Sequence, residues 1–265
     1  MANDLDYLAH LARDSARFAE VLRGTSPDAR VPTCPDWNAD DLLWHLAEVQ
    51  WFWGTIVRDN ASRAQAEERK PPRPADRPGL LAFYQGASSD LGTALAETPV
   101  EAARWTWADD QTAGFIRRRQ AQEALVHRLD AELTAGSRSP MDPQLSADGV
   151  DEALRVMFDG DVPDWGTFTP DPPRTLRVHA QDTGDSWFVT LGRFTGTDPS
   201  DQKSYDEPSI RVSGDPGEGE AALVAGSAAD LDCWLWQRPP LGRVERSGDE
   251  ALLAGLQSLV AAGIQ

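Results

Sequence analysis

Three side chains that could bind a metal or transfer a proton, Glu123, His127 and Asp130, lie in one stretch with a helical pattern, RRRQAQEALVHRLDAE (residues 117–132). Spacings of four and three residues place side chains on one face of an α-helix. The group could therefore form a metal or acid–base site. Taken alone, however, the stretch favours an amphipathic helix whose polar stripe faces water, because such helices are common.

A histidine in a second helical segment, His45, can complete such a site. It lies in DLLWHLAEVQWFWGTIV, where its neighbours on the helical face, including Leu42, Val49 and Phe52, are apolar, so this face is expected to be buried. A buried imidazole needs partners for its ring nitrogens, and both a hydrogen-bonded core histidine and a metal ligand meet that need. If the two helices pack side by side, two imidazoles and one carboxylate converge in a helical bundle. That is a ligand set of catalytic zinc, with the fourth position open.

Two further charged residues share the face of Glu123 and His127. Asp130 can accept a hydrogen bond from a ligand histidine and orient it, although a solvated acid fits the spacing equally well. Arg119 can meet a substrate carboxylate, because guanidinium groups bind carboxylates through parallel hydrogen bonds. Cys34 and Cys233, the two cysteines, lack the spacing of a zinc or redox motif, so we expect reduced, structural thiols.

The composition narrows the class of protein. A chain of 265 residues with 10 tryptophans can build two domains. Its net charge of -18 and its lack of a dense basic patch argue against a nucleic-acid partner. The first residues do not resemble a leader peptide, and no apolar run approaches the roughly 18 residues of a membrane span. We therefore expect a cytoplasmic protein, a monomer or homodimer, with small-molecule partners.

Apolar residues at three- and four-residue spacing predict helices in the first half of the chain. One of them should begin after Asn38, whose side chain can cap it, with Asp41 three residues later. Residues 61–79, ASRAQAEERKPPRPADRPG, have no period and predict an exposed loop or lid. The predicted helices span residues 8–24, 39–57, 80–96, 114–133 and 150–158.

The pattern changes after a segment rich in proline, glycine and aspartate, residues 159–174, which we interpret as a linker. Alternating apolar residues then predict a β-hairpin around the DTGD turn. Further strands are expected near 210–212 and 221–224, with helices over 228–237, capped by Ser227, and 249–262. The fold class is therefore multidomain, a helical domain over residues 1–165 followed by a smaller α+β domain over 166–265.

Three of these segments resemble one family. PTCPDWNADDLLWHLAEV and RRRQAQEALVHRLDAE resemble the two signatures of the DinB-like, mycothiol-dependent maleylpyruvate isomerase family. The segment VAGSAADLDCWLWQRPPLGRVERSGDEALLAGL resembles its smaller domain, which is similar in fold to sterol-carrier proteins. The resemblance implies a DinB-like four-helix bundle in which His45, Glu123 and His127 bind zinc. It also implies that Arg238, in WLWQR, reaches the site and holds an anionic substrate or cofactor.

The function implied by this resemblance uses Zn²⁺ and mycothiol. A thiol bound at the open zinc position loses its proton near neutral pH and can attack an electrophilic carbon, which leads to cis–trans isomerisation or to S-conjugation. Mycothiol is the thiol of high-GC actinobacteria, and the presence of lysine only at Lys70 and Lys203 agrees with such a genome. Two alternatives remain open. They are a non-catalytic small-molecule-binding or regulatory module, which the many tryptophans favour, and a metal-dependent hydrolase, which uses the same open position for water.

Overall fold

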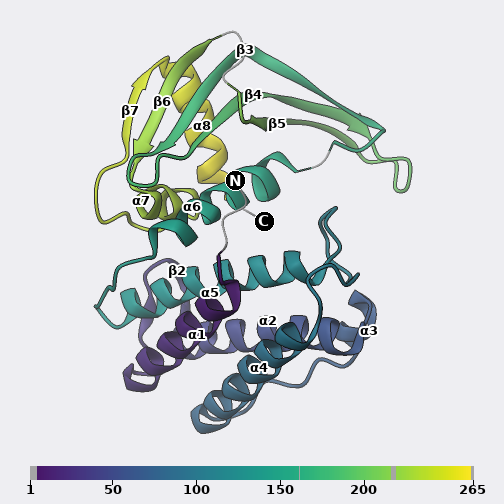
Figure 1. The fold of residues 1–265 in the computed structure, drawn as a ribbon, viewed down its shortest axis with the longest axis vertical. Coiled ribbons are helices and arrows are strands. Elements are labelled where there is room, and N and C mark those ends of the chain that lie inside the picture. Colours follow the sequence, from purple (N-terminus) through teal and green to yellow (C-terminus); the bar gives the residue numbers. More distant parts are fainter. Residues whose placement is uncertain (1–4, 161, 216–218, 264–265) are drawn as a thin grey trace. The chain divides into compact units, whose positions relative to one another are not determined.

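The chain divides into two compact units, Met1–Pro140 and Met141–Gln265. The computed structural model describes residues 5–160, 162–215 and 219–263 (Figure 1). The sequence predicted a division after residue 165. The structure divides earlier because the segment just after Pro140 buries Ala147, Val150 and Leu154 in the apolar core of the second unit.

The first unit is helical, as predicted, and its four long helices pack against one another. Its core contains Phe18, Leu22, Leu42, Leu46 and Tyr84, all essentially inaccessible to solvent. Among the described residues, no helix combines the length and apolar character that a membrane crossing requires. The elements are α1 (Tyr7–Gly24), β1 (Arg30–Val31), β2 (Cys34–Asn38), α2 (Ala39–Asp59), α3 (Arg63–Glu68), α4 (Arg77–Glu97) and α5 (Ala113–Thr134).

The start of α2 confirms the predicted cap. The side chain of Asn38 accepts a hydrogen bond from the backbone N–H of Asp41 at 2.9 Å, and the carboxylate of Asp41 accepts one from the backbone N–H of Asn38 at 3.0 Å. This reciprocal pair satisfies two N–H groups that the first helical turn leaves free. The cap therefore fixes where α2 begins, and with it the turn on which His45 lies.

The prediction of a loop over residues 61–79 is wrong in part. Helix α3 begins after Ser62, which forms a capping box with Gln65, and α4 begins after Asp76, whose carboxylate accepts from the N–H of Gly79 at 2.8 Å. Pro78 lies in the first turn of α4, where its missing N–H costs nothing. These local caps define helix starts that the apolar period alone does not reveal.

The second unit is a five-stranded sheet with helices (Figure 1). The strands follow the order β5-β4-β3-β6-β7, in which β3 and β6 are parallel and the other neighbours antiparallel. This confirms the predicted α+β class and the hairpin. The elements are α6 (Pro143–Glu152), the π-helix η1 (Ala153–Asp159), β3 (Gly166–Ala180), β4 (Ser186–Thr197), β5 (Ser204–Ser213), β6 (Glu220–Gly226), α7 (Ala228–Leu235), β7 (Glu245–Gly248) and α8 (Glu250–Ala262).

Two boundaries of this unit differ from the prediction. The linker expected over residues 159–174 ends before Gly166, where β3 begins, because Gly166 and Thr167 already pair with Gly196 and Thr195 of β4. The helix expected from residue 150 begins at Pro143, since Asp142 caps the N–H of Leu145. The predicted cap of α7 is confirmed: the hydroxyl of Ser227 accepts from the N–H of Asp230 at 3.1 Å.

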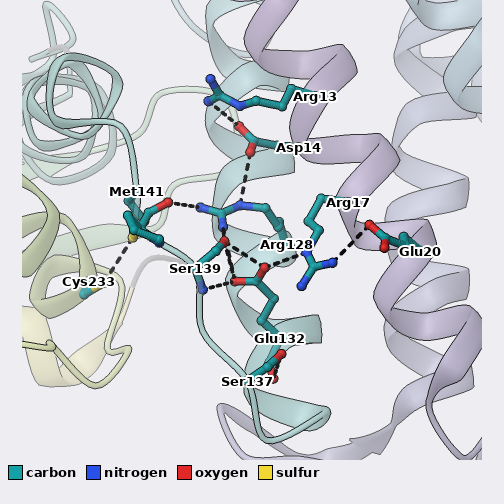
Figure 2. Close-up of polar contacts among 11 residues, drawn as sticks. Arg13, Asp14, Arg17, Glu20, Arg128, Glu132, Ser137, Ser139, Met141 and Cys233 are labelled. Atoms are coloured by element: carbon teal, nitrogen blue, oxygen red, sulfur yellow. Dashed lines mark hydrogen bonds and ion pairs between the residues drawn. The ribbon is translucent and has the colours of Figure 1, made fainter.

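A buried network of charges joins α1 to α5. The Nε of Arg128 lies 3.1 Å from Oδ1 of Asp14, and its Nη1 lies 3.1 Å from Oε2 of Glu132. Arg17 and the backbone N–H of Ser139 both donate to Glu132 at 2.9 Å. Figure 2 shows these side chains turned toward one another between the two helices. Because charges cannot be buried without partners, this network fixes the rotation of α5 about its axis, and therefore the direction of its other side chains.

We predict that the substitution Arg128→Ala destabilises the protein by about 3–5 kcal/mol, because Asp14 and Glu132 stay buried but lose the cation that both of them contact. The measurement is urea denaturation followed by circular dichroism. Arg13→Ala is the matched control: Arg13 pairs with the same Asp14, but its own side chain is 54% exposed, so its loss should cost about 0–1 kcal/mol. Equal effects of the two substitutions would contradict a stabilising role specific to the buried network.

Candidate metal centre

The three residues predicted as metal ligands converge in the first unit. His45 lies on the second turn of α2, and Glu123 and His127 lie one turn apart on α5. The Nε2 atom of His127 is 3.1 Å from Oε1 of Glu123, and the Nε2 atom of His45 is 3.5 Å from that same oxygen. All three candidate ligand atoms lie within 4.8 Å of one another. Packing of α2 against α5 therefore brings together residues separated by almost eighty positions in the sequence.

The chemistry of these atoms fits a zinc-like ion. Zinc binds histidine nitrogen and carboxylate oxygen at about 2.0–2.2 Å with tetrahedral geometry, so neighbouring ligand atoms are about 3.3–3.6 Å apart. The two distances to Glu123 lie close to this range. An imidazole nitrogen without its proton and a carboxylate oxygen both present lone pairs, so both can bind one cation placed between them. The ion would be held by two histidines and one glutamate.

Two hydrogen bonds in series orient the ring of His127 on its Nδ1 side, away from Glu123. Its Nδ1 atom lies 2.9 Å from Oδ2 of Asp130, and the hydroxyl of Thr33 donates to Oδ1 of Asp130 at 2.6 Å. Asp130 is completely buried, so its interpretation as a solvated acid is wrong. Donation of the Nδ1 hydrogen to Asp130 leaves Nε2, on the side of Glu123, as the ring nitrogen that can bind a metal once it has lost its proton.

Thr33 is a site residue that sequence reasoning missed. It lies in the turn between β1 and β2, and nothing in its own neighbourhood predicts a contact with α5. The one available signal is its place in the PTCPDW segment directly before the helix of His45. Its contact with Asp130 joins residues 97 positions apart.

Arg119 belongs to the same cluster, one turn before Glu123. Its Nη2 donates to Oε2 of Glu123 at 2.9 Å, and its side chain is 6% exposed. Burial alone would raise the pKa of Glu123, but the contacts with His127 and His45 and the charge of Arg119 hold that pKa well below the usual value. Glu123 is therefore an anion. The predicted contact of Arg119 with a substrate stays a prediction.

The protonation of His127 depends on the carboxylates on either side. Burial lowers its pKa, but the hydrogen bonds to Asp130 and Glu123 outweigh burial and raise the pKa to about 9. In the absence of a metal, the ring is therefore an imidazolium held between two anions. A proton occupies the place that a metal ion would take.

Helix α5 does not present a polar stripe to water, and that interpretation of residues 117–132 is wrong. Gln120, His127, Arg128 and Asp130 are all buried. On α2, by contrast, the structure is more open than predicted. The side chain of His45 is 29% exposed, although its helical face was expected to be buried. Among the three candidate ligands, His127 is therefore enclosed, whereas His45 and Glu123 remain partly accessible.

Two models of one family match consecutive parts of the chain. The model described as mycothiol maleylpyruvate isomerase N-terminal domain matches residues 8–132, which include all three candidate ligands, and the C-terminal domain model of the same family matches residues 144–255. The chain belongs to the mycothiol maleylpyruvate isomerase family. Both signature segments fall inside the first matched range, and the C-terminal segment falls inside the second except for its last residue, Leu256. The predicted family is therefore confirmed.

Solved structures agree with this family at the level of the fold. The chain is similar to the crystal structure of the mycothiol-dependent maleylpyruvate isomerase, with 13% identity and a TM-score of 0.57 over 92% of this chain and 93% of the other. A histidine-to-alanine mutant of an isomerase with that name gives 13% identity and a TM-score of 0.58 with the same coverage. No curated protein matches the sequence significantly.

The remaining predicted site residue of this family member, Arg238, lies in the second unit. It follows α7, where its backbone N–H donates to the carbonyl of Cys233 at 2.7 Å and its guanidinium donates to the carbonyl of Trp236 at 2.7 Å. It is partly buried. Its predicted approach to the metal ligands stays a prediction.

We predict that Asp130→Asn lowers the affinity for Zn²⁺ about 10–100-fold, because it weakens the hydrogen bond that holds the tautomer of His127. The measurement is competition with a coloured chelator. His127→Ala should abolish stoichiometric binding, whereas His179→Ala, which removes a histidine of the second unit, should leave it unchanged. An affinity for Zn²⁺ that neither Asp130→Asn nor His127→Ala changes would show that the ion binds elsewhere.

Zinc uptake should also release a proton. Because the folded metal-free protein holds His127 protonated up to a pKa of about 9 and a metal ligand must be neutral, about one proton should leave at pH 7, and the number should fall toward zero as the pH rises through 9. Calorimetry in two buffers of different ionisation enthalpy measures this number. Identical heats in both buffers at pH 7 would contradict a protonated His127.

Proposed function

We propose that the chain is a zinc-dependent enzyme that activates a low-molecular-weight thiol, mycothiol, for cis–trans isomerisation of a small electrophile or for S-conjugation to it. The observation that carries the proposal is the convergence of His45, Glu123 and His127, with His45 accessible to solvent. Family membership supports the thiol and the isomerase chemistry. The similar solved structures, which are described as mycothiol-dependent maleylpyruvate isomerases, support the same reading.

A zinc ion held by His45, Glu123 and His127 would supply a positive charge that lowers the pKa of a bound thiol, so that the thiolate is present near neutral pH. The chain itself prepares this position. Asp130 and Thr33 orient the ring of His127, and the contacts with His127 and His45, together with the charge of Arg119, keep Glu123 anionic. We assign to Arg238 the binding of an anionic group of the substrate or of the thiol, because a guanidinium pairs well with carboxylates.

The proposed reaction begins when the thiolate sulfur adds to one carbon of a carbon–carbon double bond that is conjugated to a carbonyl group. The electron pair moves onto the carbonyl oxygen, and the former double bond becomes a single bond that can rotate. In isomerisation, the electron pair returns, the double bond forms again in the trans geometry and the thiolate leaves. In S-conjugation, the carbon next to the carbonyl takes up a proton instead, and the thioether is released.

The test is an assay of the zinc-loaded protein with mycothiol and maleylpyruvate, followed by ultraviolet absorbance, together with mass spectrometry of a panel of other electrophiles. We expect turnover that needs both the thiol and the metal, and that His45→Ala and His127→Ala abolish. His179→Ala is the control with full activity. Thiol-independent hydrolysis would favour the metal-dependent hydrolase instead, and tight binding without any turnover would favour the non-catalytic module.

A further inference from the structure

A pocket of about 400 Å³ lies within the first unit, along α2, the helix that carries His45. It is formed by α2, by α3 with the residues that follow it, and by the segment that contains Trp105 and Trp107. The volume lies at the lower end of the range of about 300–1,000 Å³ that small-molecule sites occupy. The pocket takes in part of residues 61–79, the segment that the sequence predicted as an exposed loop or lid.

The walls of this pocket are aromatic. Trp53 and Trp105 are stacked, with ring centroids 5.9 Å apart and planes 17° apart, and Phe52 meets Trp105 edge to face. Trp107 packs its ring against Phe115 at 5.7 Å but remains 50% exposed. Most large apolar side chains of the described chain are buried, so an exposed tryptophan on the rim of an aromatic pocket indicates a binding surface.

The charged residues around the pocket neutralise one another. Lys70 Nζ lies 2.5 Å from Oε2 of Glu48, and Arg63 Nε lies 2.7 Å from Oε1 of Glu67. Each cation therefore has an anion of its own, and no net charge is left to select a charged ligand. Flat tryptophan faces pack best against another flat ring in offset or edge contacts. The lining therefore favours an uncharged aromatic group.

The pocket and the metal ligand His45 lie on one face of α2. Val49 and Phe52, which line the pocket, follow His45 by four and seven residues, which is the spacing of one helical face. At 1.5 Å per residue, Phe52 lies about 10 Å along the helix from His45. One small molecule can therefore place a ring in the pocket while its other end lies at His45.

We propose that this pocket binds the uncharged aromatic ring of an electrophilic substrate, so that the chain acts on aryl-substituted unsaturated carbonyl compounds. The assignment of the substrate class rests on the proposed function, whereas the binding of the ring by Trp107 and its neighbours does not. The ring would stack within the aromatic walls, and the reactive carbon would face the metal ligands.

The binding test uses benzylacetone, which cannot accept a thiolate by conjugate addition, and its cyclohexyl analogue, each titrated by calorimetry into zinc-loaded and zinc-free protein. Benzylacetone should bind more tightly than the cyclohexyl analogue, and Trp107→Ala should weaken it about threefold to tenfold. Trp107→Phe should largely restore binding. Trp165→Ala removes a partly buried tryptophan of the second unit and is the control without effect.

Equal affinities of the two ligands, an undiminished affinity in Trp107→Ala, or no binding to the wild type would overturn the proposal. Thermal unfolding of Trp107→Ala checks that the variant is folded. The substrate class is tested separately by assays with mycothiol and either benzylideneacetone or 3-penten-2-one, which has a methyl group in place of the phenyl ring. The wild type should have the higher kcat/KM with benzylideneacetone, and Trp107→Ala should lose that preference. Ring binding without turnover would refute the proposed function and the substrate class, while the pocket assignment would stand.

Discussion

The structure of the first unit depends on one constraint: helix α5 is buried on nearly all sides although it carries many charged side chains. Charges in the interior are stable only beside opposite charges or hydrogen-bond donors. Helix α1 supplies the partners of Arg128 and Glu132, the β1–β2 turn supplies the donor to Asp130, and α2 brings His45 to Glu123. The bundle is therefore arranged around α5 by matching of charges as well as by apolar packing.

This arrangement explains how two ligands of the candidate metal centre are held by buried partners while the centre stays partly accessible. Glu123 and His127 are held by Arg119 and Asp130, which are themselves buried. His45 comes from a different helix and keeps part of its ring in contact with solvent. Two ligands are thus fixed before an ion binds, so little conformational entropy is lost on binding, while the third faces the side from which a thiol or substrate can arrive.

Much of the architecture could be predicted from local patterns, because caps and apolar periods act over a few residues. Asn38, Ser227 and the four-residue spacing of Glu123 and His127 are of this kind. The burial of α5 could not be predicted, since its polar residues are satisfied by Asp14, Arg17 and Thr33, which are distant in sequence. The same holds for the strand before Thr175, where pairing with β4 overrides a proline-rich composition typical of a linker.

The face of α2 has a consequence for how this protein can change during evolution. His45 and the pocket residues Val49 and Phe52 share one rigid helix, so a shift or rotation of α2 moves all three by the same amount. A change that adjusts the helix to a new ligand would displace the metal ligand as well. The other walls, the segment of α3 and the residues around Trp107, can by contrast change their backbone position without moving His45.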